Sequence, residues 1–169
     1  MAQWDRSGEL PPGWTVLSES EARDVWRRFK RKFDFRPSTN KADWPSIKER
    51  SDSITYKLPA ASQIDYQQVW DRMRSLFCRL CRSPGDRIYV LDWNHRNYWL
   101  DPQQANEDWV IHPIPAGEYH VYLHPDFHWG LFGHPWEWTL NLFGDVLPAE
   151  LKRERLEIFR TAPLRGGSL

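Results

Sequence analysis

The stretch GLFGHPWEWTLNLFG, residues 130–144, carries the strongest local pattern in the chain. Its second half alternates between apolar and polar side chains, which is the pattern of a β-strand with one buried face. The residues expected on the buried face are Trp136, Trp138, Leu140 and Leu142. The opposite, polar face carries Glu137, Thr139 and Asn141. His134-Pro135 is expected to form a rigid corner at the entrance to this strand.

Helical periodicity predicts three further elements. Ser18 and Glu21 form a capping box at the start of a helix predicted over residues 18–33. The apolar residues that recur at helical spacing and are expected on its core side are Ala22, Val25, Trp26, Phe29 and Phe33. A second amphipathic helix is predicted over residues 62–82. A short charged helix is predicted over residues 145–159, because its proline falls in the first turn, where no backbone N–H is needed.

Period-two patterns predict the strands of a sheet. The segments are residues 53–58, 87–93, 98–100, 118–123, 127–132 and 136–143. Short turns between successive strands favour antiparallel pairing. We therefore predict an α+β fold, with a mostly antiparallel sheet of five to six strands, two amphipathic helices packed on one face and a short C-terminal helix.

The length of 169 residues favours a single domain. Residues 1–17 are predicted to be an irregular N-terminal arm, because Pro11, Pro12 and Gly13 interrupt any regular element. Residues 18–160 form the predicted α+β domain. Residues 161–169 are predicted to be a flexible tail.

Charge and hydropathy exclude several classes of protein. The chain carries 23 basic and 23 acidic residues, whereas nucleic-acid binders usually have a basic excess, so the overall charge argues against a nucleic-acid partner. No apolar run approaches the ~18 residues of a membrane span, and the first residues lack a hydrophobic signal region. A cytoplasmic protein that does not contact a membrane is expected.

No metal site and no cofactor are expected from the sequence. His120, His124 and His128 are spaced by four residues, but the strand pattern argues against a helix there. On a strand, His120 and His124 lie about 13 Å apart, too far to share one zinc ion. Cys78 and Cys81 form a C-x-x-C, but a second cysteine pair is lacking, so we interpret them as ordinary helix residues.

Several segments together resemble a bacterial domain family of unknown function with an F-G-H-P-W-E-x-T signature. The matching segments are FDFRPS (33–38), SITY (53–56), LDWNH (91–95), GEYHVYL (117–123) with Asp126, and FGHPWEWTL (132–140). Trp138 departs from the pattern, in which a polar residue is expected. The resemblance implies no established activity. By analogy with small bacterial α+β proteins that neutralise polymorphic toxins, it suggests an immunity-type role.

The leading hypothesis is a non-enzymatic cytosolic protein that binds and neutralises a bacterial toxin. The chain has eleven tryptophans, and Trp, Tyr and Arg are typical of binding hot spots. Residues expected to bind a partner lie at strand ends and turns: His95, Arg96, Asp126, His134, Glu137, Thr139 and Asn141. Candidates for exposed tryptophans are Trp93, Trp99, Trp109 and Trp129. The sequence leaves the oligomeric state and the identity of the partner open.

Two alternatives remain open at this point. In the first, the protein is a small hydrolase in which His134 is a general base oriented by Glu137 or Asp92. The structural interpretation of the same residues is that His134 and Glu137 only fix the turn. In the second, the basic side of the first helix binds RNA or an acidic partner. Its residues are Arg23, Arg27, Arg28, Lys30, Arg31 and Lys32.

Overall fold

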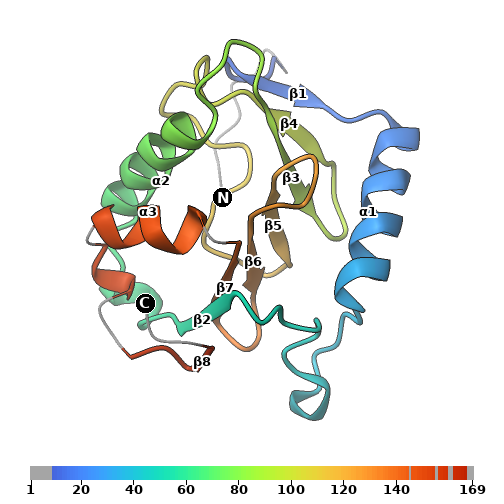
Figure 1. Cartoon of the computed structure of the whole chain (residues 1–169), viewed down its shortest axis with the longest axis vertical. Helices are drawn as coiled ribbons and strands as arrows, with labels where there is room; N and C mark the ends of the chain where they lie inside the picture. Colours follow the sequence, from blue (N-terminus) through green and yellow to red (C-terminus); the bar gives the residue numbers. More distant parts are fainter. Residues whose placement is uncertain (1–8, 145, 155, 160–161, 167–169) are drawn as a thin grey trace.

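A single antiparallel sheet forms the centre of the molecule (Figure 1). The structure is a computed structural model, and it describes residues 9–144, 146–154, 156–159 and 162–166. Within these residues the sheet has eight strands in the order β1-β4-β3-β5-β6-β7-β2-β8. Helix α1 covers one face of the sheet, and helices α2 and α3 cover the other (Figure 1). We call these the α1 face and the α2 face.

The strands agree in position with the period-two segments, and two more lie at the edges. The inner strands are β4 (Tyr98–Leu100), β3 (Ile88–Asp92), β5 (His120–Leu123), β6 (Gly130–His134), β7 (Thr139–Phe143) and β2 (Ser53–Lys57). The edge strands are β1 (Trp14–Val16) and β8 (Arg165–Gly166). The prediction of five to six strands was therefore too low, because β8 has only two residues and β1 directly follows the prolines and glycine that indicate irregular structure.

Both edge strands fall in segments that the sequence predicts to be irregular. β1 pairs with β4 at one end of the sheet, so the predicted N-terminal arm contributes to it. β8 pairs with β2 at the other end, in the predicted flexible tail. The remainder of these two predictions, at residues 1–8, 161 and 167–169, lies outside the described residues.

The helices begin where side chains can cap them. At α1 (Glu19–Phe33) the capping box is confirmed: Ser18 Oγ accepts a hydrogen bond from the Glu21 N–H, and the Glu21 carboxylate accepts one from the Ser18 N–H. Helix α2 (Tyr66–Leu80) is capped by Asp65, three residues later than the predicted start. The last helix is α3 (Val146–Glu154). The part of the chain that the structure describes also contains three short 3₁₀ helices, η1 (Lys41–Asp43), η2 (Ala61–Gln63) and η3 (Glu157–Phe159).

The prediction that both amphipathic helices pack on one face was wrong. The apolar side of α1, with Val25, Phe29 and Phe33, packs in a cluster with Leu91 and Phe132 of the sheet. The α2 stripe packs in a separate cluster that contains the alternate strand residues. The sequence feature that indicates helices on both faces is the unbroken apolar character of the central strands. Such runs indicate strands covered on both faces, although that pattern is best known from parallel sheets.

The stretch 130–144 is a hairpin made by β6 and β7, rather than a strand that starts at Trp136. The residues between the two strands form a turn, which the Trp138 N–H closes by donating to the His134 carbonyl oxygen at 2.9 Å. Trp136 is 39% exposed, so it does not lie on the predicted buried face. Trp138 has a positive φ of 60° and is half-buried, and it packs against the core that contains Leu140 and Leu142. Leu140 and Leu142 are fully buried there, as predicted.

The predicted polar face of this stretch is also covered. Thr139 and Asn141 are 2% and 3% exposed, and they share the α1 face with Phe132 and Phe143. Gly130 permits the close pairing at the far end of the hairpin. A Cβ at this position would lie 2.4 Å from the Phe143 ring and 2.8 Å from the Tyr122 carbonyl oxygen.

Of the ten tryptophans in the described residues, four are buried, five are half-buried and one is exposed. Trp99, Trp109 and Trp129 are buried, and Trp93 is half-buried, so the only one of the four candidates with substantial exposure is Trp93. Among the described residues, no helix combines the length and the apolar character that a membrane span requires.

Candidate functional site

Four of the predicted site residues meet at the β6–β7 corner on the α1 face. His134 ends β6 and lies opposite Thr139 in the register, while Asn141 lies opposite Phe132. Glu137 belongs to the turn between the strands and is 8% exposed. The local sequence brings these residues together because the hairpin folds its two halves onto each other. We call this group, with the side chains that bond to it, the corner cluster.

His134 has both ring nitrogens engaged. The ring is 0% exposed, and Nδ1 accepts a hydrogen bond of 2.9 Å from the Glu137 N–H. The proton of the neutral ring therefore lies on Nε2, which donates to Ser46 Oγ at 3.1 Å. Burial lowers the pKa of His134 to about 4, against the attraction of Glu137. A neutral ring whose lone pair is bonded to backbone is well suited to hold the turn and poorly suited to act as a general base.

The hydrogen-bond chain continues from Ser46 to Tyr119. Ser46 Oγ lies 2.9 Å from the Tyr119 hydroxyl, which donates to the Ser38 carbonyl oxygen at 3.0 Å. The Ser38 N–H donates back to the same hydroxyl at 3.1 Å. The loop that contains Ser38 and Ser46 is thereby fixed over the end of the sheet.

Arg165 joins Glu137 to Glu49. Its Nη1 and Nη2 donate to the two oxygens of Glu137 at 2.6 and 2.9 Å, and its Nε donates to Glu49 at 3.0 Å. The exposed fractions of the three side chains are 30% for Arg165, 18% for Glu49 and 10% for Glu137. Burial alone would raise the pKa of Glu137, but the hydrogen bonds and charge of Arg165 outweigh it, and the pKa is lowered.

Asn141 completes the corner cluster below this ion pair. Its Nδ2 donates to Thr55 Oγ1 at 2.8 Å and to Ser53 Oγ at 3.1 Å, while Thr55 Oγ1 donates to Glu49 at 2.7 Å. The Asn141 Oδ1 is buried without a hydrogen-bond partner. Sequence reasoning missed Arg165 and Glu49, because neither stands in a local pattern that points to the hairpin.

Asp92 lies on the opposite face of the sheet from His134. Along β3, Leu91 belongs to the α1-face core and Val90 to the α2-face core, so Asp92 points to the α2 face. Phe132 places His134 on the α1 face by the same alternation. Asp92 therefore does not orient His134, and the hydrolase pairing of these two residues finds no support in the geometry.

Asp92 instead contacts two other histidines. His95 Nδ1 donates to its carboxylate at 2.9 Å, and His120 Nε2 lies 3.7 Å from the second oxygen. The hydrogen bond and charge of Asp92 raise the pKa of His95, whereas burial lowers the pKa of His120. Arg96, the neighbour of His95 in the turn, is exposed.

Replacing Asp92 with asparagine is expected to lower the pKa of His95 towards its ordinary value. The carboxylate supplies the charge that favours the imidazolium, and an amide of the same shape does not. An NMR titration of the His95 ring protons in both proteins measures the change. An unchanged titration midpoint would contradict this assignment of the raised pKa.

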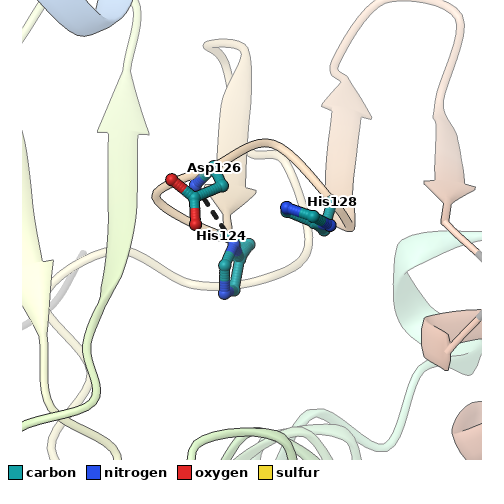
Figure 2. Close-up of side chains that lie close together, drawn as sticks. All are labelled: His124, Asp126 and His128. Atoms are coloured by element: carbon teal, nitrogen blue, oxygen red, sulfur yellow. Dashed lines mark hydrogen bonds between the residues drawn. The ribbon is translucent and has the colours of Figure 1, made fainter.

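Asp126 lies in the turn between β5 and β6, beside His124 and His128 (Figure 2). The Asp126 N–H donates to His124 Nδ1 at 3.1 Å. The three side chains are separate from the corner cluster and from the Asp92 group. The structure thus divides the predicted site residues among three places.

An open groove of about 750 Å³ runs along α1. Its lining residues come from α1, from the segment after it and from the end of β3: Ala22, Arg23, Trp26, Arg27, Lys30, Arg31, Asp34, Phe35 and Trp93. The Trp26 ring is stacked on Phe35 at 5.6 Å and meets the edge of Trp93 at 5.1 Å. The Lys30 ammonium lies 4.6 Å from the centre of the Trp93 ring.

The groove separates the basic residues of α1 into two groups. Arg27 and Arg31 are exposed on its wall. Arg28 turns away from it, donates to the Pro125 carbonyl oxygen at 3.0 Å and covers the Phe127 ring. The sequence identified the basic side of this helix, but it assigned Trp26 to the core, so it missed the aromatic floor.

Comparison with known proteins agrees with the resemblance seen in the sequence. The model of a family described as "Protein of unknown function (DUF2716)" matches residues 16–147. The chain belongs to this family. The DUF2716 match extends from the last residue of β1 into α3, so it contains the groove and most of the corner cluster, while Arg165 lies beyond it.

One relative matches the chain over most of its length. The chain is similar to "Uncharacterized protein YxiI" of Bacillus subtilis (strain 168), with 25% identity over 160 residues. The alignment covers 87% of this chain and 97% of that protein. No solved structure matches the chain.

Proposed function

We infer that this protein is a non-enzymatic binding protein whose α1 groove holds an acidic segment of a partner protein. We further infer that the partner is a bacterial toxin, which the chain neutralises in the cytoplasm. The observation that carries the first inference is the combination of an aromatic floor with four basic residues and one acidic residue along one open groove.

The chemistry of the groove favours a protein partner. Tryptophan and arginine are enriched at binding hot spots, because they offer a large contact area together with polar groups. The Trp26 and Trp93 rings provide that area, and both are half-buried rather than covered. A partner side chain placed against them would be shielded from water, which strengthens the neighbouring charge pairs.

Charge indicates an acidic segment rather than nucleic acid. The formal net charge of the chain is zero, so the positive potential is local to the groove and does not extend over the molecule. Proteins that bind nucleic acid obtain much of their affinity from many phosphate contacts, which require a broader basic surface. A short acidic segment needs only the few cations present here.

The corner cluster supports a binding role in preference to hydrolysis. His134 is fully buried with both nitrogens bonded, and Arg165 already occupies the Glu137 carboxylate. These groups lack an open position at which a substrate would meet a free base. They are suited to fix the loop and the C-terminal strand, whereas the groove is open to a partner.

Reversing two charges in the groove is expected to weaken partner binding by about tenfold or more. The variant is Arg27→Glu with Arg31→Glu, since both side chains are exposed on the groove wall. The matched control, Lys48→Glu with Arg82→Glu, changes the net charge equally at exposed positions outside the groove. The measurement is calorimetric titration with the toxin encoded beside the gene, at two salt concentrations.

A protection assay in the producing cell tests the second part of the proposal. Cells that express the toxin should survive with the wild-type protein and with the control variant, but not with the groove variant. If the protein binds the toxin but does not protect the cell, the groove remains the binding site and the proposal that the protein neutralises the toxin is rejected. If the groove variant and the control variant bind the toxin with equal affinity, the groove is not the binding site. Binding of single-stranded RNA in place of the protein would transfer the site to the RNA alternative.

A further inference from the structure

The turn that joins β5 to β6 brings together three side chains with metal-binding atoms. One such atom from each of His124, Asp126 and His128 lies within 4.8 Å of the others. Figure 2 shows the three side chains grouped on one side of the turn. The sequence argument against a metal site compared His120 with His124 along a strand. The pair that approaches is His124 with His128, whose ring centres are 5.3 Å apart across the turn.

A buried side chain and several hydrogen bonds fix the backbone of this turn. Phe127 is 2% exposed, and its side chain packs in the α1-face core between the two outward residues 126 and 128. Arg28 donates to the Pro125 carbonyl oxygen and Arg50 to the Phe127 carbonyl oxygen, each at 3.0 Å. The Phe127 N–H closes the turn on the His124 carbonyl oxygen at 2.8 Å. The three side chains therefore project from a fixed backbone.

The hydrogen bond within the turn selects the ring nitrogen that faces the group. The Asp126 N–H donates to His124 Nδ1, so this nitrogen carries the lone pair and Nε2 carries the proton. In Figure 2 the bonded nitrogen lies on the side of the ring nearer to Asp126 and His128, and the other nitrogen points away. A metal ion that replaces this N–H donor would meet a lone pair on the side of the ring that is nearer to Asp126 and His128.

We propose that His124 Nδ1, the Asp126 carboxylate and His128 bind one divalent transition-metal ion of the zinc class. Ligand atoms of a tetrahedral zinc ion lie about 3.4 Å apart, as follows from bonds of about 2.0–2.1 Å. The ligand atoms lie within 4.8 Å of one another, so the three groups must close by at most roughly 1.4 Å. Asp126 and His128 are exposed, so rotation of their side chains can supply this movement.

The ligand set determines the class of ion. Two imidazoles with one carboxylate suit zinc, cobalt or iron, whereas calcium and magnesium prefer oxygen ligands. Three protein ligands leave a position for water. The ion would connect the end of β5 to the start of β6. It would therefore bind the folded chain better than the unfolded chain and raise the midpoint of thermal unfolding.

Metal titration of the full chain, prepared without a histidine tag and stripped with EDTA, tests the proposal. Zinc competition against a chromogenic chelator should give one equivalent bound, with a dissociation constant in the micromolar range or below. Cobalt should give visible d–d absorption with the same stoichiometry. His128→Ala and Asp126→Asn should each weaken zinc binding by about tenfold or more. Both residues are exposed, so these variants should fold.

The matched control is His95→Ala, which removes an exposed histidine from a different turn. It should leave zinc binding and the zinc-dependent rise in unfolding temperature unchanged. The proposal fails if the chain binds no zinc in this range, or if His128→Ala binds as the wild type does. It also fails if His95→Ala loses as much affinity as His128→Ala, because the ion would then associate only adventitiously with surface histidines.

Discussion

Replacing Arg165 with alanine is expected to lower the free energy of unfolding by about 3 kcal/mol at pH 7. The substitution leaves Glu49 and Glu137 facing each other without their shared cation, and both carboxylates are largely buried. It also removes the side chain that attaches β8 to the hairpin turn. Urea unfolding followed by circular dichroism measures the loss. The control Arg153→Ala removes a cation that is 75% exposed beside Glu150, and it should cost about 0.5 kcal/mol or less.

The dependence of this loss on pH has a definite sign. In the wild type the pKa of Glu137 is lowered, so its contribution is present above the ordinary glutamate pKa and is lost as the pH falls through the folded value. Without Arg165, burial remains and raises the pKa of this carboxyl. In mild acid, protonation of Glu137 then removes the uncompensated buried charge in the variant. The difference in the free energy of unfolding between the wild type and the variant should therefore narrow between pH 7 and pH 5. A gap that stays constant or widens would contradict the role given to Glu137.

Local patterns in the sequence predicted the elements that depend on neighbouring residues. The capping box at Ser18 and Glu21 is formed within four residues, and the alternation through Leu140 and Leu142 reports directly on a pleated strand. β8 shows the limit of this approach. Its two residues have no period, and its place in the sheet is fixed by Arg165, which contacts Glu49 over a separation of 116 residues.

The same limit applies to the candidate site, of which only the part carried by one local element was predicted. His134, Glu137, Thr139 and Asn141 were expected together because one hairpin carries them. The groove required side chains from α1, the following segment and the end of β3, and a helical period alone assigned Trp26 to the core. Sequence spacing gives no distance between elements that fold together from far apart.

The segments of the family resemblance meet in the structure. Ser38, Tyr119 and His134 come from three of those segments, and they join at the Tyr119 hydroxyl through contacts of 3.0 to 3.5 Å. Thr55, from a fourth segment, bonds to Asn141 in the neighbouring strand. These residues account for the motif as a means of fixing the hairpin and its covering loop. The groove then rests on a scaffold in which the backbone of the adjacent loop is held.

Replacing His134 with asparagine is expected to lower the free energy of unfolding by about 3 kcal/mol at pH 7.5. The amide oxygen can still accept the Glu137 N–H, but Ser46 loses its donor and the ring leaves a cavity beside Trp44 and Tyr119. A pure loss of stability with intact partner binding at low temperature is the result expected of a residue that fixes the turn.

Lowering the pH should reduce the difference in the free energy of unfolding between the wild type and His134→Asn. The unfolded chain protonates His134 below about pH 6.5, whereas the folded chain keeps it neutral down to about pH 4, so its stabilising effect is complete above pH 6.5 and is lost as the pH falls. Each unit in this window is worth about 1.4 kcal/mol, which gives the wild type an extra loss of about 2 kcal/mol between pH 6.5 and pH 5. The variant lacks that loss, so its urea midpoint should approach that of the wild type. Parallel pH profiles for the two proteins would show that the ring is protonated in the fold, and its assignment as a neutral bridge between Glu137 and Ser46 would have to be abandoned.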